Sequence, residues 1–197
     1  MRKAVTAACL CLLALCFCAA AQAGTYVFTP VPGDLGDLDH YYYDSWGINW
    51  SPPAGEQIVE ATLFIDNIND WTNETGDKLY IHLLDNPAVG VRQWYDAQGG
   101  GDAWAGNPLV GVYSDYNSYA EDLAYTFSTL GLLDDLASFA SNGVFGLGFD
   151  ADCHYYNSGV MLTVRTETTQ QAIPEPTALL LGSLGLSTVA GLLRRRG

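Results

Sequence analysis

Basic residues are scarce in this 197-residue chain, which has 8 Lys and Arg against 22 Asp and Glu. Residues 24–173 contain only three of these bases, Lys78, Arg92 and Arg165, and carry a net charge of −18. A phosphate backbone is held by clustered Lys and Arg, so this composition excludes nucleic acid as a partner. Glycine-rich phosphate loops and dinucleotide-binding fingerprints are also absent from the sequence.

Cysteine is almost absent from the same region. Four of the five Cys lie within residues 1–23, and Cys153 is the only one beyond them. A single thiol excludes an internal disulfide and a zinc site built from several thiolates. The role of Cys153 stays open.

Residues 1–23 have the three parts of a secretory signal peptide. Arg2 and Lys3 supply the positive charge, residues 4–20 form an apolar helix, and Ala21 and Ala23 give the small-residue cleavage pattern. A transmembrane anchor is the alternative, but the apolar run is short and ends in a cleavage site. We therefore expect the chain to be exported.

The last 24 residues combine three features in a fixed order. Pro174, Glu175 and Pro176 precede an apolar stretch over 177–193, and Arg194, Arg195 and Arg196 follow it. As a helix, this stretch would span roughly 25 Å, a little under the thickness of a hydrocarbon core. Because arginines stay on the cytoplasmic side, the tail predicts a transmembrane helix in the inner membrane with the acidic region outside.

This order of motif, membrane span and arginine cluster resembles the PEP-CTERM sorting signal of Gram-negative bacteria. The resemblance covers about residues 173–197 and implies an exosortase as partner, which would remove the tail. The resemblance also implies that the protein is then released or transferred to the cell surface. Members of this family usually occur in bacteria that make exopolysaccharide. A simple tail-anchored protein is the alternative.

The central region predicts an all-β domain over residues 24–166. Its apolar residues alternate over short segments that are separated by Gly, Pro, Asn and Asp. This spacing predicts a two-sheet antiparallel sandwich, jelly-roll-like. Residues 132–140 have helical periodicity and predict the one short helix of the domain. The expected strands cover 24–31, 41–50, 58–65, 78–84, 108–113, 123–130, 144–149 and 160–166.

The domain organisation follows from these patterns: signal peptide 1–23, β-sandwich 24–166, linker with the PEP motif 167–176 and sorting tail 177–197. The segments 145–159 and 76–85 also look like parts of exported PEP-CTERM proteins with an uncharacterised β-sandwich domain. That likeness implies a fold without implying an activity.

Asp150 and Asp152, with the side-chain carbonyl of Asn157, could ligate calcium in the turn after the strand at 144–149, since hard cations take oxygen ligands. The alternative is a polar turn whose side chains bond their own backbone. Apart from calcium, the sequence predicts no cofactor.

Trp71, Trp94 and Trp104 lie in or beside polar, glycine-rich segments. Aromatic faces exposed in loops can stack on sugar rings. The alternative is that these rings cover the ends of the sandwich. Trp46 and Trp50, by contrast, share a strand face with Ile48 and predict core positions.

No coherent catalytic set is present. Cys153 and His154 are neighbours, and in an extended chain they would point to opposite faces, so they cannot form a nucleophile and base pair. We therefore expect a non-enzymatic surface or matrix protein that interacts with exopolysaccharide. The alternatives are an extracellular glycan-active hydrolase with two paired carboxylates and a structural module stabilised by calcium.

Overall fold

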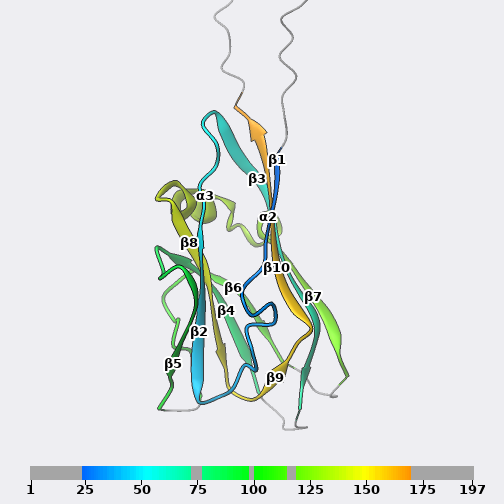
Figure 1. Ribbon diagram of the computed structural model, residues 1–197. Coiled ribbons are helices and arrows are strands. Elements are labelled where there is room, and N and C mark those ends of the chain that lie inside the picture. Colours follow the sequence, from blue (N-terminus) through cyan, green and yellow to red (C-terminus); the bar gives the residue numbers. More distant parts are fainter. Residues whose placement is uncertain (1–23, 72–76, 98–99, 115–118, 170–197) are drawn as a thin grey trace, which may run out of the picture.

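The structure, a computed structural model, describes residues 24–71, 77–97, 100–114 and 119–169 (Figure 1). Strands predominate in these residues, and two short helices join them between the seventh and eighth strands. The elements are β1 (Gly24–Phe28), β2 (Tyr42–Asn49), β3 (Glu56–Asp70), β4 (Leu79–Asp85), β5 (Gly90–Tyr95), β6 (Leu109–Tyr113), β7 (Glu121–Thr126), α2 (Phe127–Leu130), α3 (Leu133–Ser141), β8 (Val144–Ala151), β9 (Tyr155–Tyr156) and β10 (Gly159–Thr168).

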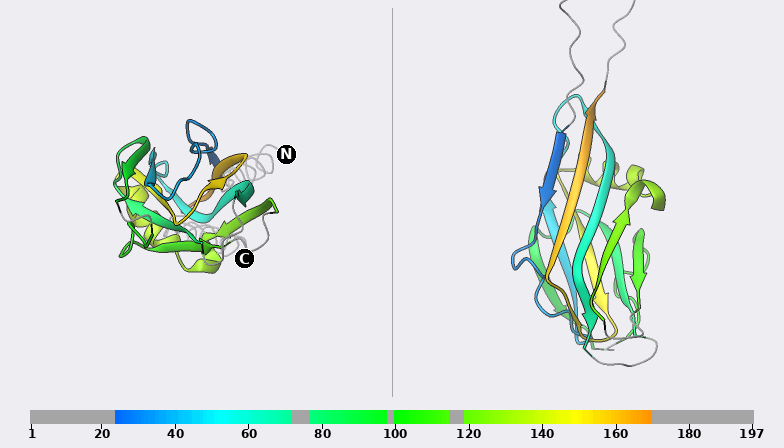
Figure 2. Two further views of the ribbon diagram at one scale, coloured as in Figure 1. Left: turned by 90° about the horizontal axis from the view of Figure 1, so that it is seen from below. Right: turned by 90° about the vertical axis from the view of Figure 1, so that its right-hand side faces the viewer.

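The strands form two antiparallel sheets that face each other (Figures 1 and 2). One has the order β1-β10-β3-β7, with β9 paired to the end of β3, and the other has the order β5-β2-β8-β4-β6. The expected mostly β fold with two antiparallel sheets is therefore confirmed, and the arrangement is consistent with a β-sandwich.

The core lies between the sheets and follows from the alternation of the strands. In β3, Ala61, Leu63 and Ile65 are buried, while the intervening residues face outward. In β8, Phe145, Leu147 and Phe149 supply large buried side chains, and the residues between them are buried as well. Burial of such side chains stabilises a fold by about 1.5–3 kcal/mol each relative to exposure. Trp46 and Ile48 are buried too, and Trp50 packs partly buried against the core, as predicted.

A helical connection from β7 to β8 covers one end of this core. α3 lies one residue beyond the predicted helix at 132–140; it buries Leu136 and Ala140 and contacts strands of both sheets. The prediction of a single helix is wrong for the described part of the chain, because α2 occupies Phe127–Leu130. The predicted strand 123–130 is therefore wrong for residues 127–130, because the strand ends at Thr126 and the chain turns into α2 there.

Two strands were not predicted from the sequence. β5 is an edge strand with mostly exposed side chains, and β9 is only two residues long. β10 extends to Thr168, which is two residues beyond the expected domain end.

The predicted signal peptide with Ala21 and Ala23, the PEP motif and the sorting tail lie outside the described residues. Within the described ranges, no helix is long and apolar enough to cross a membrane.

Candidate functional site

The two ends of the sandwich differ in what they carry. The described chain begins at Gly24 in β1 and ends at Thr169 after β10, and these residues lie at the same end (Figure 1). The opposite end carries the start of β2, the ends of β3 and β5, and β9. This second end, called the distal end below, collects the histidine and aromatic side chains that form the candidate site.

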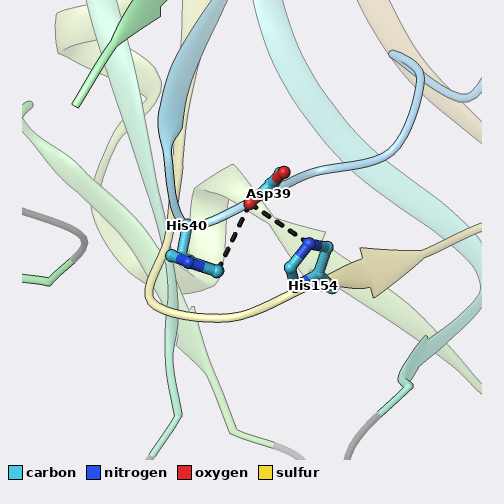
Figure 3. A group of neighbouring side chains, drawn as sticks. All are labelled: Asp39, His40 and His154. Carbon is cyan, nitrogen blue, oxygen red and sulfur yellow. Dashed lines mark ion pairs between the residues drawn. The ribbon is translucent and has the colours of Figure 1, made fainter. Parts of the chain in front are cut away.

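At the distal end, one carboxylate lies between two imidazoles (Figure 3). Asp39 Oδ1 is 3.3 Å from His40 Nδ1 and 3.3 Å from His154 Nε2. One potential ligand atom from each of the three residues lies within 4.8 Å of the other two. All three side chains are about one-quarter exposed, so the group is accessible from solvent. Their donor types could hold a metal ion.

Backbone pairing brings these distant residues together. The residue before Asp39, Leu38, exchanges two backbone hydrogen bonds with Tyr155, at 3.2 and 2.8 Å. Tyr155 also pairs with Asp70 at the end of β3, and the Trp71 N–H donates to the His154 carbonyl at 3.3 Å. Leu38 and Tyr155 are buried and anchor both segments, which leaves their neighbours His40 and His154 at the surface.

Exposed aromatic rings surround this group. The Tyr41 ring centroid lies 3.9 Å from that of His40, and the Trp71 ring lies 4.8 Å from that of His154. Trp71 is 56% exposed, as the sugar-stacking prediction required. In the described ranges, all seven exposed Tyr and Trp side chains belong to segments at the distal end: Tyr41, Tyr42, Trp71, Trp94, Tyr95, Tyr119 and Tyr156.

Trp94 and Trp104 belong to a second aromatic group, on the outer face of the β5-β2-β8-β4-β6 sheet. The Trp94 ring stacks on Tyr43 with centroids 5.5 Å apart, and 38% of Trp94 remains exposed. Trp104 is half-buried because its ring covers Gly148 and its Nε1 donates to the Asp44 carbonyl at 3.1 Å. Trp94 is thus available to a ligand, whereas Trp104 anchors its own segment.

The segment over 100–108 folds back onto that outer face. His82 in β4 binds it twice, through Nε2 to Asp102 Oδ2 at 2.9 Å and through Nδ1 to the Asn107 carbonyl at 3.0 Å. Together with Trp104, these contacts bury an imidazole and explain why His82 lies apart from the other two histidines.

The predicted calcium ligands hold this same segment. Asp150 accepts a hydrogen bond from Ala103 N at 2.5 Å, and Asp152 accepts one from Gly101 N at 3.0 Å. Asn157, the third suggested ligand, donates through Nδ2 to the Asp34 carbonyl. All three side chains therefore form hydrogen bonds with backbone atoms of other segments. A calcium site at Asp150 and Asp152 stays a prediction.

Two buried carboxyl groups have strongly altered acidity. Burial raises the pKa of Asp150 to about 6, and the nearby acids Asp96, Asp102 and Asp152 add to this while the Ala103 hydrogen bond opposes it. Burial likewise raises the pKa of Asp44 to about 6, against a hydrogen bond from Gln93. Desolvation disfavours the charged carboxylate, which is the cause in both cases.

Cys153 is buried and lies beside Asp70, to which its Sγ donates at 3.5 Å. Asp77 completes this group, with one ligand atom from each residue within 4.8 Å of the others. The neighbouring His154 turns toward Asp39 instead. In the structure, the two neighbouring side chains thus contact different carboxylates, Asp70 and Asp39.

A hydrolase would need two converging carboxylates that a substrate can reach. Asp44 and Asp150 have raised pKa values, but each is at most 2% exposed. A groove of about 560 Å³ between residues 51–58 and α3 contains Glu56 and Asp134. There Glu56 already accepts hydrogen bonds from Thr166 and Tyr26. Neither place offers an accessible carboxylate pair of the kind that the hydrolase hypothesis requires.

Comparison with known proteins adds no identification. No protein-family model matches the chain, and no similar sequence is found among curated proteins.

Proposed function

We propose that this chain is an exported, non-enzymatic surface or matrix protein that binds exopolysaccharide through the aromatic side chains of its distal end. The observation that carries the proposal is the location of all seven exposed Tyr and Trp side chains of the described ranges at the end opposite Gly24 and Thr169. Isolated apolar side chains are common on any surface, but an accumulation at one end is typical of a binding site.

The exposed aromatic rings and the attachment point of the tail lie at opposite ends of the domain, which fits delivery by a PEP-CTERM signal. A sorting tail over 177–197, joined through the linker 167–176, would attach the domain to the inner membrane before processing, and the distal end would then face away from the membrane. An exosortase would remove the tail at the inner membrane, and the domain would then be released or transferred to the cell surface. The high negative charge keeps such a domain soluble in a hydrated, cation-rich matrix.

The finer fold proposed here is a jelly roll. With β5 and β9 set aside, the eight remaining strands follow the order first-eighth-third-sixth in one sheet and second-seventh-fourth-fifth in the other. Two interleaved Greek keys give this order, and lectin domains are among the proteins that use it. The fold alone does not imply sugar binding, so the proposal depends on the exposed rings.

Replacing Trp71 or Trp94 by alanine should weaken binding to the exopolysaccharide of the producing bacterium about five- to ten-fold each. A stacked ring contributes about 1 kcal/mol beyond its buried area, which corresponds to this factor. Binding is measured by retention of the protein on the immobilised polysaccharide. Leu130→Ala removes an equally exposed side chain near the opposite end and should leave retention unchanged. Equal retention of all variants would remove the sugar-binding part of the proposal.

Changing Pro174, Glu175 and Pro176 to alanine should leave the protein unprocessed in the inner membrane. The motif is expected to be the recognition element for the exosortase, whereas the apolar stretch and arginines alone would still anchor the chain. Immunoblots of membrane and extracellular fractions measure the outcome. Alanines at Gln170 and Gln171 change the same linker outside the motif and should allow normal release. Release of the motif variant would contradict the sorting assignment.

A further inference from the structure

We propose that Asp39, His40 and His154 form a binding site for one divalent transition-metal ion of the zinc type. The site lies at the distal end but does not depend on sugar binding, because its evidence is the geometry of three side chains. This site was not predicted from the sequence, because its residues come from two distant segments, the loop before β2 and the turn before β9.

The spacing of the donor atoms fits a metal better than it fits ion pairs. Both oxygen-to-nitrogen distances are 3.3 Å, from Asp39 to His40 and from Asp39 to His154. A charge-assisted N–H···O bond is shorter, about 2.7–2.9 Å. In a tetrahedral site with bonds of about 2.0–2.1 Å, neighbouring donors are about 3.3–3.4 Å apart. One nitrogen of each imidazole lies within 4.8 Å of the other, so the three donor atoms are close enough to share one ion.

The donor set selects the kind of ion. Two imidazole nitrogens and one carboxylate oxygen suit zinc, nickel or copper, whereas calcium and magnesium take oxygen ligands almost entirely. The ring centroids of His40 and His154 are 4.9 Å apart, so both imidazoles are close enough to bind the same ion.

Groups around the three ligands hold them in place. The Tyr41 N–H donates to Asp39 Oδ1 at 3.1 Å and fixes the carboxylate. The Tyr41 ring packs on His40, and the Trp71 ring packs on His154. The Trp71 N–H also fixes the His154 backbone. Such outer contacts orient ligands and strengthen metal binding.

Partial exposure determines what the bound ion could do. Each ligand side chain is about one-quarter exposed, and three protein ligands leave at least one coordination position open. An open position on an exposed ion accepts water or an oxygen ligand from another molecule. The site is therefore a point where a partner with carboxylate or hydroxyl groups can be bound through the metal.

Calorimetric titration with zinc chloride tests the proposal on the chain without residues 1–23, whose four cysteines could bind zinc themselves, purified in detergent through a tag without histidine. We expect one zinc per chain with a micromolar Kd, and binding that persists in a large excess of calcium. Loss of binding in excess calcium would show ordinary acidic-surface binding and would overturn the proposal, as would the absence of any zinc binding.

Matched variants then locate the ion. His40→Ala, His154→Ala and Asp39→Asn should each weaken zinc binding at least ten-fold. Asp37→Asn makes the same charge change at an exposed position of the same loop and should have no effect on Kd. Unchanged binding in all three ligand variants would exclude this site.

Nuclear magnetic resonance of the unaltered protein also locates the ion, and its result does not depend on whether the substituted proteins fold. The chain has three histidines, and zinc should shift the imidazole nitrogen signals of His40 and His154 but not those of His82, which is already bound to Asp102 and Asn107. Shifts confined to carboxyl groups, with both surface imidazoles unchanged, would overturn the assignment.

Discussion

Replacing Gly146 by alanine should lower the free energy of unfolding by about 3 kcal/mol, the upper end of the usual cost of overpacking. A Cβ atom at this position in β8 would lie 2.6 Å from Pro87 Cγ and still closer to the Trp46 carbonyl oxygen in the neighbouring strand β2. Backbone atoms of a paired strand cannot move aside without breaking the sheet. Urea-induced unfolding, followed by tryptophan fluorescence, measures the loss.

Gly159 provides the matched control for this substitution. It also belongs to a sheet strand, and a Cβ atom there would meet nothing within 4 Å. Gly159→Ala should therefore change stability by no more than about 0.5 kcal/mol, as expected for a surface substitution. If Gly146→Ala were as stable as Gly159→Ala, the close approach of β2, β8 and the turn before β5 would be wrong.

The same glycines show why part of the fold was predictable and part was not. Phe145, Leu147 and Phe149 alternate with Gly146 and Gly148, and this alternation correctly predicted a strand. The alternation gives the inner face but does not say why the outer face needs glycine. The reason lies in distant segments, because the turn at Pro87 covers Gly146 and the Trp104 ring covers Gly148.

β5 was not predicted because it lies at the edge of its sheet. β5 pairs with β2 along one side only, and four of its six side chains are exposed. An edge strand of this kind does not need a continuous apolar face, so Gly90–Tyr95 lacks the alternation that identified β3 and β10. Its charged Arg92 is also typical of protected sheet edges.

The candidate site was predictable only at the level of single residues. Trp71 and Trp94 lie in or beside polar segments and are exposed, as the sugar-stacking interpretation requires. Trp104 has a similar glycine-rich context, yet its segment folds back onto the sheet and the ring becomes half-buried. Local geometry predicted that the side chains of His154 and Cys153 point apart. It could not predict the contact of His154 with Asp39, because that contact depends on the backbone pairing of Leu38 with Tyr155.

Stability should be higher at about pH 4.5 than at about pH 7.5, because of Asp44 and Asp150. Their pKa values are raised from 3.8 to about 6 in the folded protein. Between about pH 4 and pH 6, the folded state therefore keeps protons that the unfolded chain has released, and unfolding releases them. The stabilising contribution is complete below the unfolded value and is lost as pH rises through about 6.

The expected size of this effect is a few kcal/mol. Between about pH 4.5 and pH 7.5, two such pKa shifts correspond to an upper limit of roughly 4 kcal/mol. Solvent screening and the mutual interaction of the two carboxyls reduce this to on the order of 2–3 kcal/mol. For a domain of this size, the melting temperature should fall by roughly 4–12 °C between the two pH values. Thermal unfolding followed by circular dichroism across the pH range measures it.

Asp44→Asn separates this mechanism from general charge repulsion. The amide is neutral at every pH, so the variant should be more stable than the parent at about pH 7.5 and should lose about half of the pH dependence. Asp37→Asn removes an equal formal charge from an exposed loop position and should keep the full dependence. A parallel flattening in both variants would mean that the net charge of −18 over residues 24–173, not the two buried carboxyls, sets the pH profile.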